Sequence, residues 1–263
     1  MHDYESFNPD LICALAGVVG EDNVLMVEPM KLHTTFKIGG PADLLVKPQD
    51  PQQLVRVLDT CTFAETPVTV VGNGSDLLVS DRGIRGVVVL LRENMADVRI
   101  EGTRVIAQAG ALLRDVALAA ADAGLSGLEP LWGIPATVGG ACFMNAGAYG
   151  GQTSDVLESV DVYVPSKRGQ RGSVCTLDVD QLNMGYRKSR VNTDGLIVLS
   201  ATFKLTPDSP DAIRFAMDDF QARREEKQPL DMPSAGSTFK RPEGYFAGKL
   251  IMDAGLRGAS VGG

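Results

Sequence analysis

The chain has 263 residues, of which 44% are hydrophobic and 22% charged, and its formal net charge is −8. This length can bury a sizeable core in one large or two modest domains, while the acidic balance argues against nucleic acid as a partner. No apolar stretch approaches the ~20 residues that span a bilayer, and the N-terminus lacks a basic region followed by an apolar one. We therefore expect a cytoplasmic protein that does not bind membranes.

The predicted elements are short strands interleaved with a few helices. Apolar spacing predicts helices over 8–19, 51–64 and 111–123, the last ending at Gly124. Strand-like runs occupy 67–71, 86–91, 97–101, 103–108, 156–164, 173–178 and 195–205, with 97–108 forming a hairpin through Glu101-Gly102. This order favours an α+β fold over a regular βαβ alternation.

One further helix follows the last strand. Ser209 can cap it, Pro210 suits its first position, and Pro229 is expected to end it. Its apolar stripe is Ile213, Met217 and Phe220. The change from strands to this helix predicts the main boundary near 205–208.

The cysteines and histidines do not suggest a metal site. The four cysteines are far apart and are expected to be buried, reduced thiols, and there are only two histidines. We therefore expect no bound metal.

A first glycine-rich segment, "GNGSD", follows the strand-like run ending at Val71. It lacks the lysine of a P-loop and the third glycine of a dinucleotide fingerprint. Backbone N–H groups in such a turn can still surround an anion, here a pyrophosphate, with Asn73 and Ser75 as additional donors. A plain tight connection is the alternative interpretation.

A second glycine-rich segment, "LWGIPATVGGACFMNAGAYGG", occupies 131–151. Glycines let a backbone approach a ligand closely, so two such segments together favour a nucleotide-type ligand more than either one alone. Trp132 is expected to lie in the core or to form a wall of the cofactor site.

Six ordered segments together resemble the UDP-N-acetylenolpyruvoylglucosamine reductase (MurB) family, in its shorter type. They are "TTFKIGGPADLLV" (34–46), "VVGNGSDLLVSD" (70–81), "GLEPLWGIPATVGGACFMNAGAYGG" (127–151), "GYRKSR" (185–190), "KQPLDMPSAGSTFKRP" (227–242) and "GKLIMDAGLRG" (248–258). The resemblance implies an FAD-binding unit of two α+β lobes, as in vanillyl-alcohol-oxidase-like (PCMH-like) flavoproteins, followed by a smaller α+β substrate domain. We expect the FAD-binding unit over 1–206, with lobes of about 1–66 and 67–206, and the substrate domain over 207–263.

The resemblance also implies the cofactor and its contacts. FAD is bound without a covalent bond, and NADPH is the hydride donor. His33 is not expected to be an attachment point, because it precedes Thr34-Thr35 in what reads as a strand entrance. The cofactor-binding residues carried over are Gly72, Asn73, Gly74, Ser75, Asp76, Gly133, Ile134, Pro135, Thr137, Val138, Gly139, Gly140, Asn145, Ala146 and Gly147.

The family reduces the enolpyruvyl ether of a UDP-sugar, UDP-N-acetylglucosamine enolpyruvate. By resemblance, Arg187 in "GYRKS" binds the substrate carboxylate and Ser237 in "SAGSTFK" donates a proton to carbon. A guanidinium suits a carboxylate because its planar donors can pair with both oxygens, whereas a serine can act only against a strongly basic carbon. Tyr186, Lys227 and Lys240 match substrate contacts of the family.

Two features leave alternatives open. The family's pattern continues beyond "GLRG" to a glutamate that acts with the arginine, and this sequence stops at Gly263, so we expect the substrate domain to be incomplete. Another FAD-dependent oxidase or dehydrogenase, or a non-catalytic FAD-binding protein, would share both glycine-rich segments. The expected partners are small molecules, without an obligate protein partner.

Overall fold

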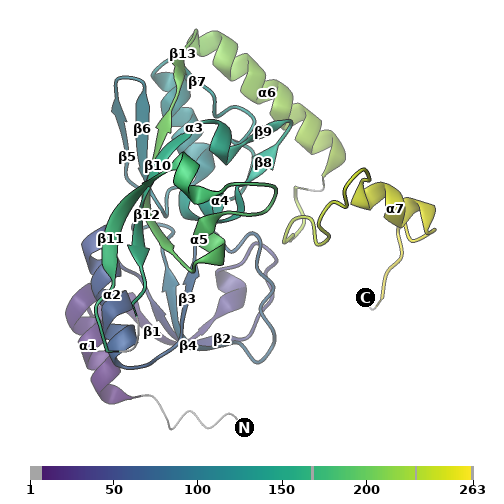
Figure 1. The fold of residues 1–263 in the computed structure, drawn as a ribbon. Coiled ribbons are helices and arrows are strands. Elements are labelled where there is room, and N and C mark those ends of the chain that lie inside the picture. The colour runs from purple at the N-terminus through teal and green to yellow at the C-terminus, as the bar shows by residue number, and fades with distance from the viewer. Residues whose placement is uncertain (1–7, 167–168, 229, 262–263) are drawn as a thin grey trace.

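The computed structural model describes residues 8–166, 169–228 and 230–261. Its helices are α1 (Pro9–Val19), α2 (Pro51–Phe63), α3 (Leu113–Asp122), α4 (Val138–Met144), α5 (Arg190–Thr193), α6 (Pro210–Lys227) and α7 (Ala247–Asp253). Short 3₁₀ turns are η2 (Glu21–Asn23), η3 (Met30–Leu32), η4 (Thr153–Asp155) and η5 (Val179–Leu182). The strands form two main sheets, stacked one above the other in Figure 1.

The first sheet contains β1 (Val24–Pro29), β2 (Pro41–Val46), β3 (Val68–Val71) and β4 (Ile84–Leu90), in the order β1-β2-β4-β3. β1 is antiparallel to β2, whereas β4 is parallel to both of its neighbours. Val87 and Val89 of β4 face the main core, and Val88 and Leu90 face a second apolar cluster. Burial on both faces is typical of parallel strands and explains the continuous apolar run of β4.

The second sheet is antiparallel, in the order β11-β10-β12-β6-β5. Its strands are β5 (Val98–Glu101), β6 (Arg104–Gln108), β10 (Leu157–Val164), β11 (Ser173–Asp178) and β12 (Ile197–Lys204). The predicted β5-β6 hairpin is confirmed, and it turns at Gly102 with φ 63°. Helices α3 and α4 contact this sheet, and the small pairs β7 (Leu125–Ser126) with β13 (Thr206–Pro207) and β8 (Gly147–Ala148) with β9 (Gly151–Gln152) lie beside it (Figure 1).

A single apolar cluster runs through both sheets. It includes Leu15 of α1, Leu54 of α2 and Phe203 of β12. At its edge the buried Tyr163 of β10 donates a hydrogen bond to Asp59 Oδ1 at 2.8 Å. Burial, and then the hydrogen bond to Asp59, raise the pKa of Tyr163 to about 12. The two sheets are therefore packed around one core.

Helix α6 begins where the sequence predicts, although Ser209 does not cap it with its side chain. The Ser209 carbonyl accepts from Ile213 N at 3.0 Å, but its hydroxyl makes no capping bond. Pro210 presets the helical φ of the first turn, so the helix begins without that bond. The helix ends at Lys227, and Pro229 lies outside the described residues.

The α6 stripe is partly confirmed. Ile213 and Met217 are buried, while Phe220 is half-buried and its ring stacks on Tyr149 with centroids 5.1 Å apart. Trp132 Nε1 donates to the Met217 carbonyl at 3.0 Å, and this bond connects α6 to the second glycine-rich segment, 131–151.

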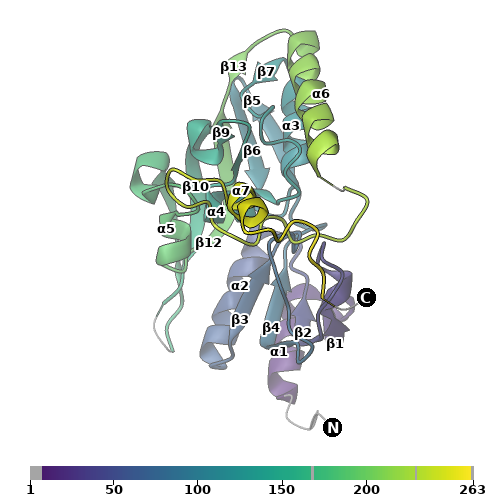
Figure 2. The same cartoon turned by 90° about the vertical axis from the view of Figure 1, so that its right-hand side faces the viewer.

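The chain after α6 lies outside both sheets. In Figure 1, α7 stands to one side of them, and in Figure 2 it lies in front of the region where they meet. Phe246, Leu250 and Met252 of this part are exposed. Its described hydrogen bonds to the rest of the protein come from the stretch before α7, at Ser234 and Arg241.

Several sequence expectations need correction. Strands β1 and β2 were not predicted, because β1 is an edge strand of half-buried side chains without clear alternation, and Val27 leaves the ladder with φ 56°. The sheets divide between β4 and β5, not near the expected lobe boundary at 66–67, because β3 and β4 pair within the first sheet. All four cysteines are free as expected, yet Cys13 and Cys175 are exposed because their positions on α1 and β11 face solvent.

No helix among the described residues is long and apolar enough to cross a membrane. Within the same residues, no cluster of three or more histidine, cysteine, aspartate or glutamate side chains is placed to hold a metal ion.

Candidate active site

The first glycine-rich loop, 72–76, begins directly after β3 and does not form a helix. Gly74 has φ 60°, and a Cβ there would lie 2.1 Å from the His33 carbonyl oxygen. A Cβ on Gly72 would lie 2.1 Å from Thr137 Oγ1. Both glycines are therefore required by neighbouring chain segments, before any ligand is considered.

The loop leaves a row of backbone donors without partners. Among the described residues, none accepts a hydrogen bond from the N–H of Asn73, Gly74, Ser75 or Asp76. Consecutive N–H groups of this kind form a concavity that suits an anion such as a diphosphate. The geometry of the loop therefore fits the predicted binding of a pyrophosphate by backbone N–H groups.

Asn73 ties the two glycine-rich segments together. Its Nδ2 donates to the Pro135 carbonyl at 2.7 Å, while its Oδ1 is buried and has no hydrogen-bond partner. A buried acceptor without a donor is costly, so a ligand with a hydroxyl or N–H group at this position would satisfy it.

The second glycine-rich segment contains a helix that the sequence did not predict. Thr137 caps α4, its Oγ1 accepting from Gly140 N at 3.4 Å. Val138 N donates to the Ala111 carbonyl at 2.8 Å and Gly139 N to the Ala109 carbonyl at 2.9 Å. These N–H groups are occupied within the protein, so this stretch contributes the shape of the site more than free donors.

Asn145 ends α4 and holds the next part of the site in place. It is 3% exposed, in the left-handed region with φ 44°. Its Nδ2 donates to Gln152 Oε1 at 3.1 Å and to the Gly185 carbonyl at 3.2 Å, and its Oδ1 accepts from Ser154 N at 3.0 Å. Ala146 is buried, and Gly147 packs closely against Gly151. The "NAG" motif thus positions the turn at 185–188.

That turn carries Tyr186 and Arg187. Gly185 and Lys188 exchange backbone hydrogen bonds at 2.9 and 3.1 Å, which leaves Tyr186 and Arg187 at the tip. Arg187 has φ 54°, and its Cζ lies 5.6 Å from the centroid of the exposed Tyr186 ring. No described carboxylate forms an ion pair with Arg187, so its guanidinium is available to a ligand.

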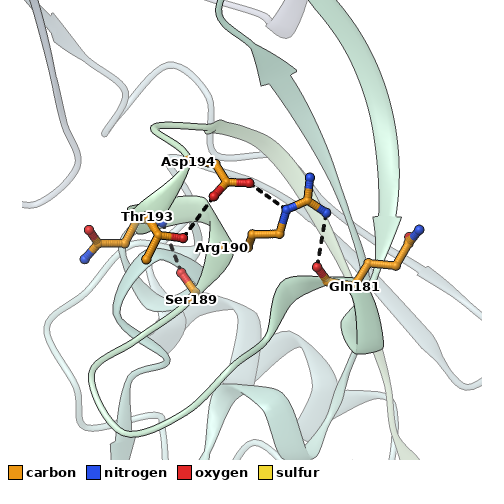
Figure 3. A network of polar contacts seen from close by, with 6 residues as sticks. Gln181, Ser189, Arg190, Thr193 and Asp194 are labelled. Carbon is orange, nitrogen blue, oxygen red and sulfur yellow. Dashed lines mark hydrogen bonds and ion pairs between the residues drawn. The ribbon is translucent and has the colours of Figure 1, made fainter.

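The short helix after the turn is well anchored. Buried Ser189 donates to the Phe143 carbonyl at 2.7 Å and caps α5. Figure 3 shows the surrounding network, in which Arg190 Nε pairs with Asp194 Oδ2 at 2.6 Å and Arg190 Nη1 donates to the Gln181 carbonyl at 3.3 Å. The hydrogen bond from Arg190, and then that from Thr193, lower the pKa of Asp194. These contacts make the base of the turn rigid.

The segment 234–241 joins the first loop to this turn. Ser234 N donates to the Thr35 carbonyl at 3.1 Å, Thr35 Oγ1 donates back to Ser234 O at 2.5 Å, and Thr35 N donates to Gly74 O at 3.3 Å. At the other end, Arg241 N donates to the Tyr186 hydroxyl at 3.1 Å. Ser237 lies between these two anchors, and the four residues to Arg241 span at most ~14 Å. The structure therefore brings Ser237 to the same side of the molecule as Arg187, although no described contact joins the two.

The other predicted residues are less constrained. Lys227 is the last residue of α6, and both it and Lys240 are exposed. The expectation that His33 lies at a strand entrance is wrong. His33 lies in a turn after η3, where its Nε2 is 2.8 Å from Glu28 Oε1. Arg241 is held by the Tyr245 carbonyl at 3.2 Å and by the Phe246 ring, whose centroid is 3.9 Å from Arg241 Cζ.

Comparison with known proteins agrees with this geometry. Residues 42–169 match the FAD binding domain family, and residues 228–263 match the C-terminal domain of UDP-N-acetylenolpyruvoylglucosamine reductase. The UDP-N-acetylenolpyruvoylglucosamine reductase of Clostridium botulinum strain Hall is 48% identical over 263 residues, which is all of this chain and 83% of that protein. The chain belongs to the UDP-N-acetylenolpyruvoylglucosamine reductase family. The Agathobacter rectalis member is 51% identical over 253 residues, 91% of this chain and 78% of that protein.

Solved structures confirm the expected fold class. The reductase of this family from Thermus caldophilus superposes with a TM-score of 0.76 at 37% identity, covering 91% of this chain and 82% of that one. Cholesterol oxidase from Brevibacterium sterolicum matches with a TM-score of 0.54 at 15% identity over 70% of this chain and 37% of its own, a likeness of fold alone. The chain is therefore an FAD-dependent oxidoreductase of the reductase family, built on the two-lobed α+β FAD-binding fold. The free amides of 73–76 and the unpartnered Asn73 Oδ1 fit that cofactor.

Sequence reasoning missed two residues that lie next to the candidate site. Thr35 links the first loop to Ser234, and Arg224 of α6 is buried against the second glycine-rich segment. A signal for Arg224 was present, because it follows Ile213, Met217 and Phe220 at helical spacing on the buried face of α6. A cation in an apolar stripe indicates an unusual environment.

Proposed function

We propose that this member of the reductase family reduces the enolpyruvyl ether of UDP-N-acetylglucosamine enolpyruvate to UDP-N-acetylmuramate with NADPH, in the synthesis of peptidoglycan precursors. Bound FAD would supply hydride transfer, first from NADPH and then to the substrate. The observation that carries the proposal is the path of 234–241, which is fastened to the first glycine loop at one end and to Tyr186 at the other. This path supports the assignment of the proposed proton donor, Ser237, and the proposed carboxylate contact, Arg187, to one cofactor site.

Arg187 binds and polarises the substrate carboxylate. Negative charge develops next to that carboxylate when hydride reaches the alkene, and a fixed cation stabilises it. The guanidinium suits this role because it lacks an ion-pair partner among the described residues and stays charged at any working pH. The hydrogen-bonded turn at 185–188 holds its backbone.

Ser237 delivers the proton to the carbon beside the carboxylate. A hydroxyl is a weak acid, so its position must be fixed with respect to the carbon. The bend before Ser237 is fixed by Gly236, which has φ 77° and donates from N to Ser234 Oγ at 3.1 Å. Tyr186, Lys227 and Lys240 provide the remaining substrate contacts.

The proposed division assigns 1–206 to the FAD-binding unit and 207–263 to the substrate domain. Arg241 and Ser234 then make contacts from the substrate domain to the FAD-binding unit, so the active site lies where the two meet. The partners proposed are NADPH and the UDP-sugar, and the proposed compartment is the cytoplasm, where nucleotide-linked precursors are made.

Stopped-flow absorbance tests the proposal in two steps. NADPH alone should bleach the flavin at the same rate in the parent protein and in Ser237→Ala. Reoxidation by the UDP-sugar should be slower by ~10²–10⁴-fold in Ser237→Ala, the range for a positioned acid, and unchanged in a control, Ser173→Ala, at an exposed position of β11. Reoxidation of Ser237→Ala at the parent rate would exclude Ser237 as the donor, and no spectral response of the parent protein to the UDP-sugar would refute the function itself.

A further inference from the structure

The side chain of Arg224 is buried at Nε and has no charge partner among the described residues. The residue is 8% exposed, and its Nε is a buried atom with no hydrogen bond. None of the described residues forms an ion pair with it or accepts a hydrogen bond from its side chain. Two of the acids nearby on α6 are engaged elsewhere, since Asp219 pairs with Arg223 at 2.6 Å and Glu225 accepts from Gln221 at 2.6 Å.

Aromatic packing offsets only part of the cost of this burial. Arg224 Cζ lies 5.6 Å from the centroid of the Tyr149 ring, which in turn stacks on Phe220. A cation–π contact of this kind is weak compared with the hydration that a charged group loses on burial. A buried cation is normally retained only when an anion or several acceptors face it, and none of the residues that the structure describes does so for Arg224.

The direction in which Arg224 faces indicates the missing anion. A Cβ on Gly133 would lie 2.7 Å from Arg224 Nε, so the guanidinium packs directly on the backbone of the Gly133-Ile134-Pro135 stretch. The other end of that stretch is held by Asn73, whose Oδ1 is the second buried polar side-chain atom without a partner. A cation and an acceptor, each without a hydrogen-bond partner among the described residues, thus lie at the two ends of 133–135. This stretch is part of the residues that match the FAD binding domain family.

We propose that Arg224 is a cofactor contact, supplied by α6 to a negatively charged group of bound FAD. Arg224 lies outside both family matches, which cover 42–169 and 228–263, so the helix between them completes the cofactor site. Two groups of FAD have the required charge, the diphosphate in either redox state and N1 of the reduced ring. This inference depends on FAD binding and not on the identity of the substrate.

The experiment compares Arg224→Gln with Arg223→Gln. The control removes a cation from the neighbouring position of the same helix, where Arg223 is 54% exposed and paired with Asp219. Apoprotein is titrated with FAD by fluorescence, and the midpoint potential of the holoprotein is measured. The thermal stability of the apoprotein is recorded for all variants.

If the diphosphate is the partner, Arg224→Gln should bind oxidised FAD about 10- to 100-fold more weakly, the range expected for losing hydrogen bonds from a charged group, with an unchanged potential. If reduced N1 is the partner, oxidised FAD should bind normally. Tenfold weaker binding of the reduced form alone should then lower the two-electron potential by about 30 mV. Arg223→Gln should show neither change. Arg224→Lys should show a smaller change than Arg224→Gln, because lysine keeps the charge but lacks the planar donors.

The melting temperature of the apoprotein distinguishes the proposed role of Arg224 from a purely structural one. Removing an unpaired buried cation should leave the melting temperature of the apoprotein unchanged or raise it, whereas removing a packing residue should lower it. The proposal is overturned if Arg224→Gln changes neither FAD affinity nor potential, or if the apoprotein melts lower and the affinity loss disappears at a temperature where both apoproteins are fully folded. Substrate turnover enters none of these measurements, so a failure here is separate from a failure of the proposed function.

Discussion

Replacing Gly74 with alanine should damage the site more than its size suggests. Gly74 has φ 60°, and a new Cβ would lie 2.1 Å from the His33 carbonyl oxygen, which is 1.3 Å closer than the 3.4 Å at which ordinary contacts begin. The carbonyl belongs to backbone and cannot rotate away. The 33–35 stretch must therefore move, and with it the hydrogen bond from Thr35 N to Gly74 O.

A matched control separates the clash from the unfavourable φ. Gly102 in the β5-β6 hairpin has φ 63°, and a Cβ there meets nothing within 4 Å. Gly102→Ala should therefore cost only the left-handed conformation, ~1–2 kcal/mol, less a few tenths for the stiffer unfolded chain. Gly74→Ala adds ~1–3 kcal/mol for overpacking and ~1 kcal/mol for the hydrogen bond, about 3–6 kcal/mol in all.

Urea unfolding of both apoproteins measures this difference, and FAD titration measures its consequence. Since Thr35 also holds Ser234, Gly74→Ala should weaken FAD binding and slow reoxidation by the UDP-sugar, while Gly102→Ala should do neither. Equal losses of stability in the two variants, with FAD affinity intact in Gly74→Ala, would show that the loop accommodates a side chain and that the close contact with His33 is not required.

Three further predictions address the anchors, the pH dependence and the thiols. Tyr186→Phe removes the acceptor for Arg241 N, so KM for the UDP-sugar should rise by roughly 2- to 10-fold, the equivalent of one hydrogen bond, with FAD affinity unchanged; an unchanged KM would mean that this contact does not hold the segment. The folded-state pKa of Tyr163 is raised from 10.0 to about 12, so its contribution to stability is complete below pH 10 and is lost as pH rises toward 12. Tyr163→Phe should flatten that alkaline loss in unfolding curves, and a curve parallel to the parent's would contradict the assignment. The thiols form an exposed pair, Cys13 and Cys175, and a buried pair, Cys61 and Cys142. Burial raises the pKa of both buried thiols to about 12, so a thiol reagent at pH 8 should modify only the exposed pair until urea is added, as counted by absorbance; rapid modification of all four would mean that the core opens.

The local elements could be predicted where the signal lies in neighbouring residues. Helix α2 begins at Pro51 and the β5-β6 hairpin turns at Gly102, as the sequence indicates. The structure adds the cap of α2, in which Asp50 accepts from Gln53 N at 2.7 Å. Strands β1 and β2 escaped, because β1 is an edge strand and Val27 interrupts its ladder. Helix α4 was not predicted either, because its glycines suggested a loop, although Thr137 caps it.

The family and the cofactor could be inferred from the sequence, because the glycine-rich segments and the other family motifs are each continuous runs of residues that can be recognised without the fold. Folding decided how these segments are used. Thr35 bonds both Gly74 of the first glycine-rich segment and Ser234, which lies 199 positions away, and Asn145 connects the second glycine-rich segment to the 185–188 turn.

The sequence by itself determined the family and the cofactor, and it indicated the residues proposed to bind FAD and act on a substrate, since these depend on residue type and local order. Only the tertiary structure decided which backbone N–H groups stay free among the described residues, which side of the molecule holds Ser237 and Arg187, and that Arg224 Nε is buried without a hydrogen bond to any described residue. The physical reason is that hydrogen-bond satisfaction and burial depend on contacts between residues distant in the chain, which no local pattern encodes.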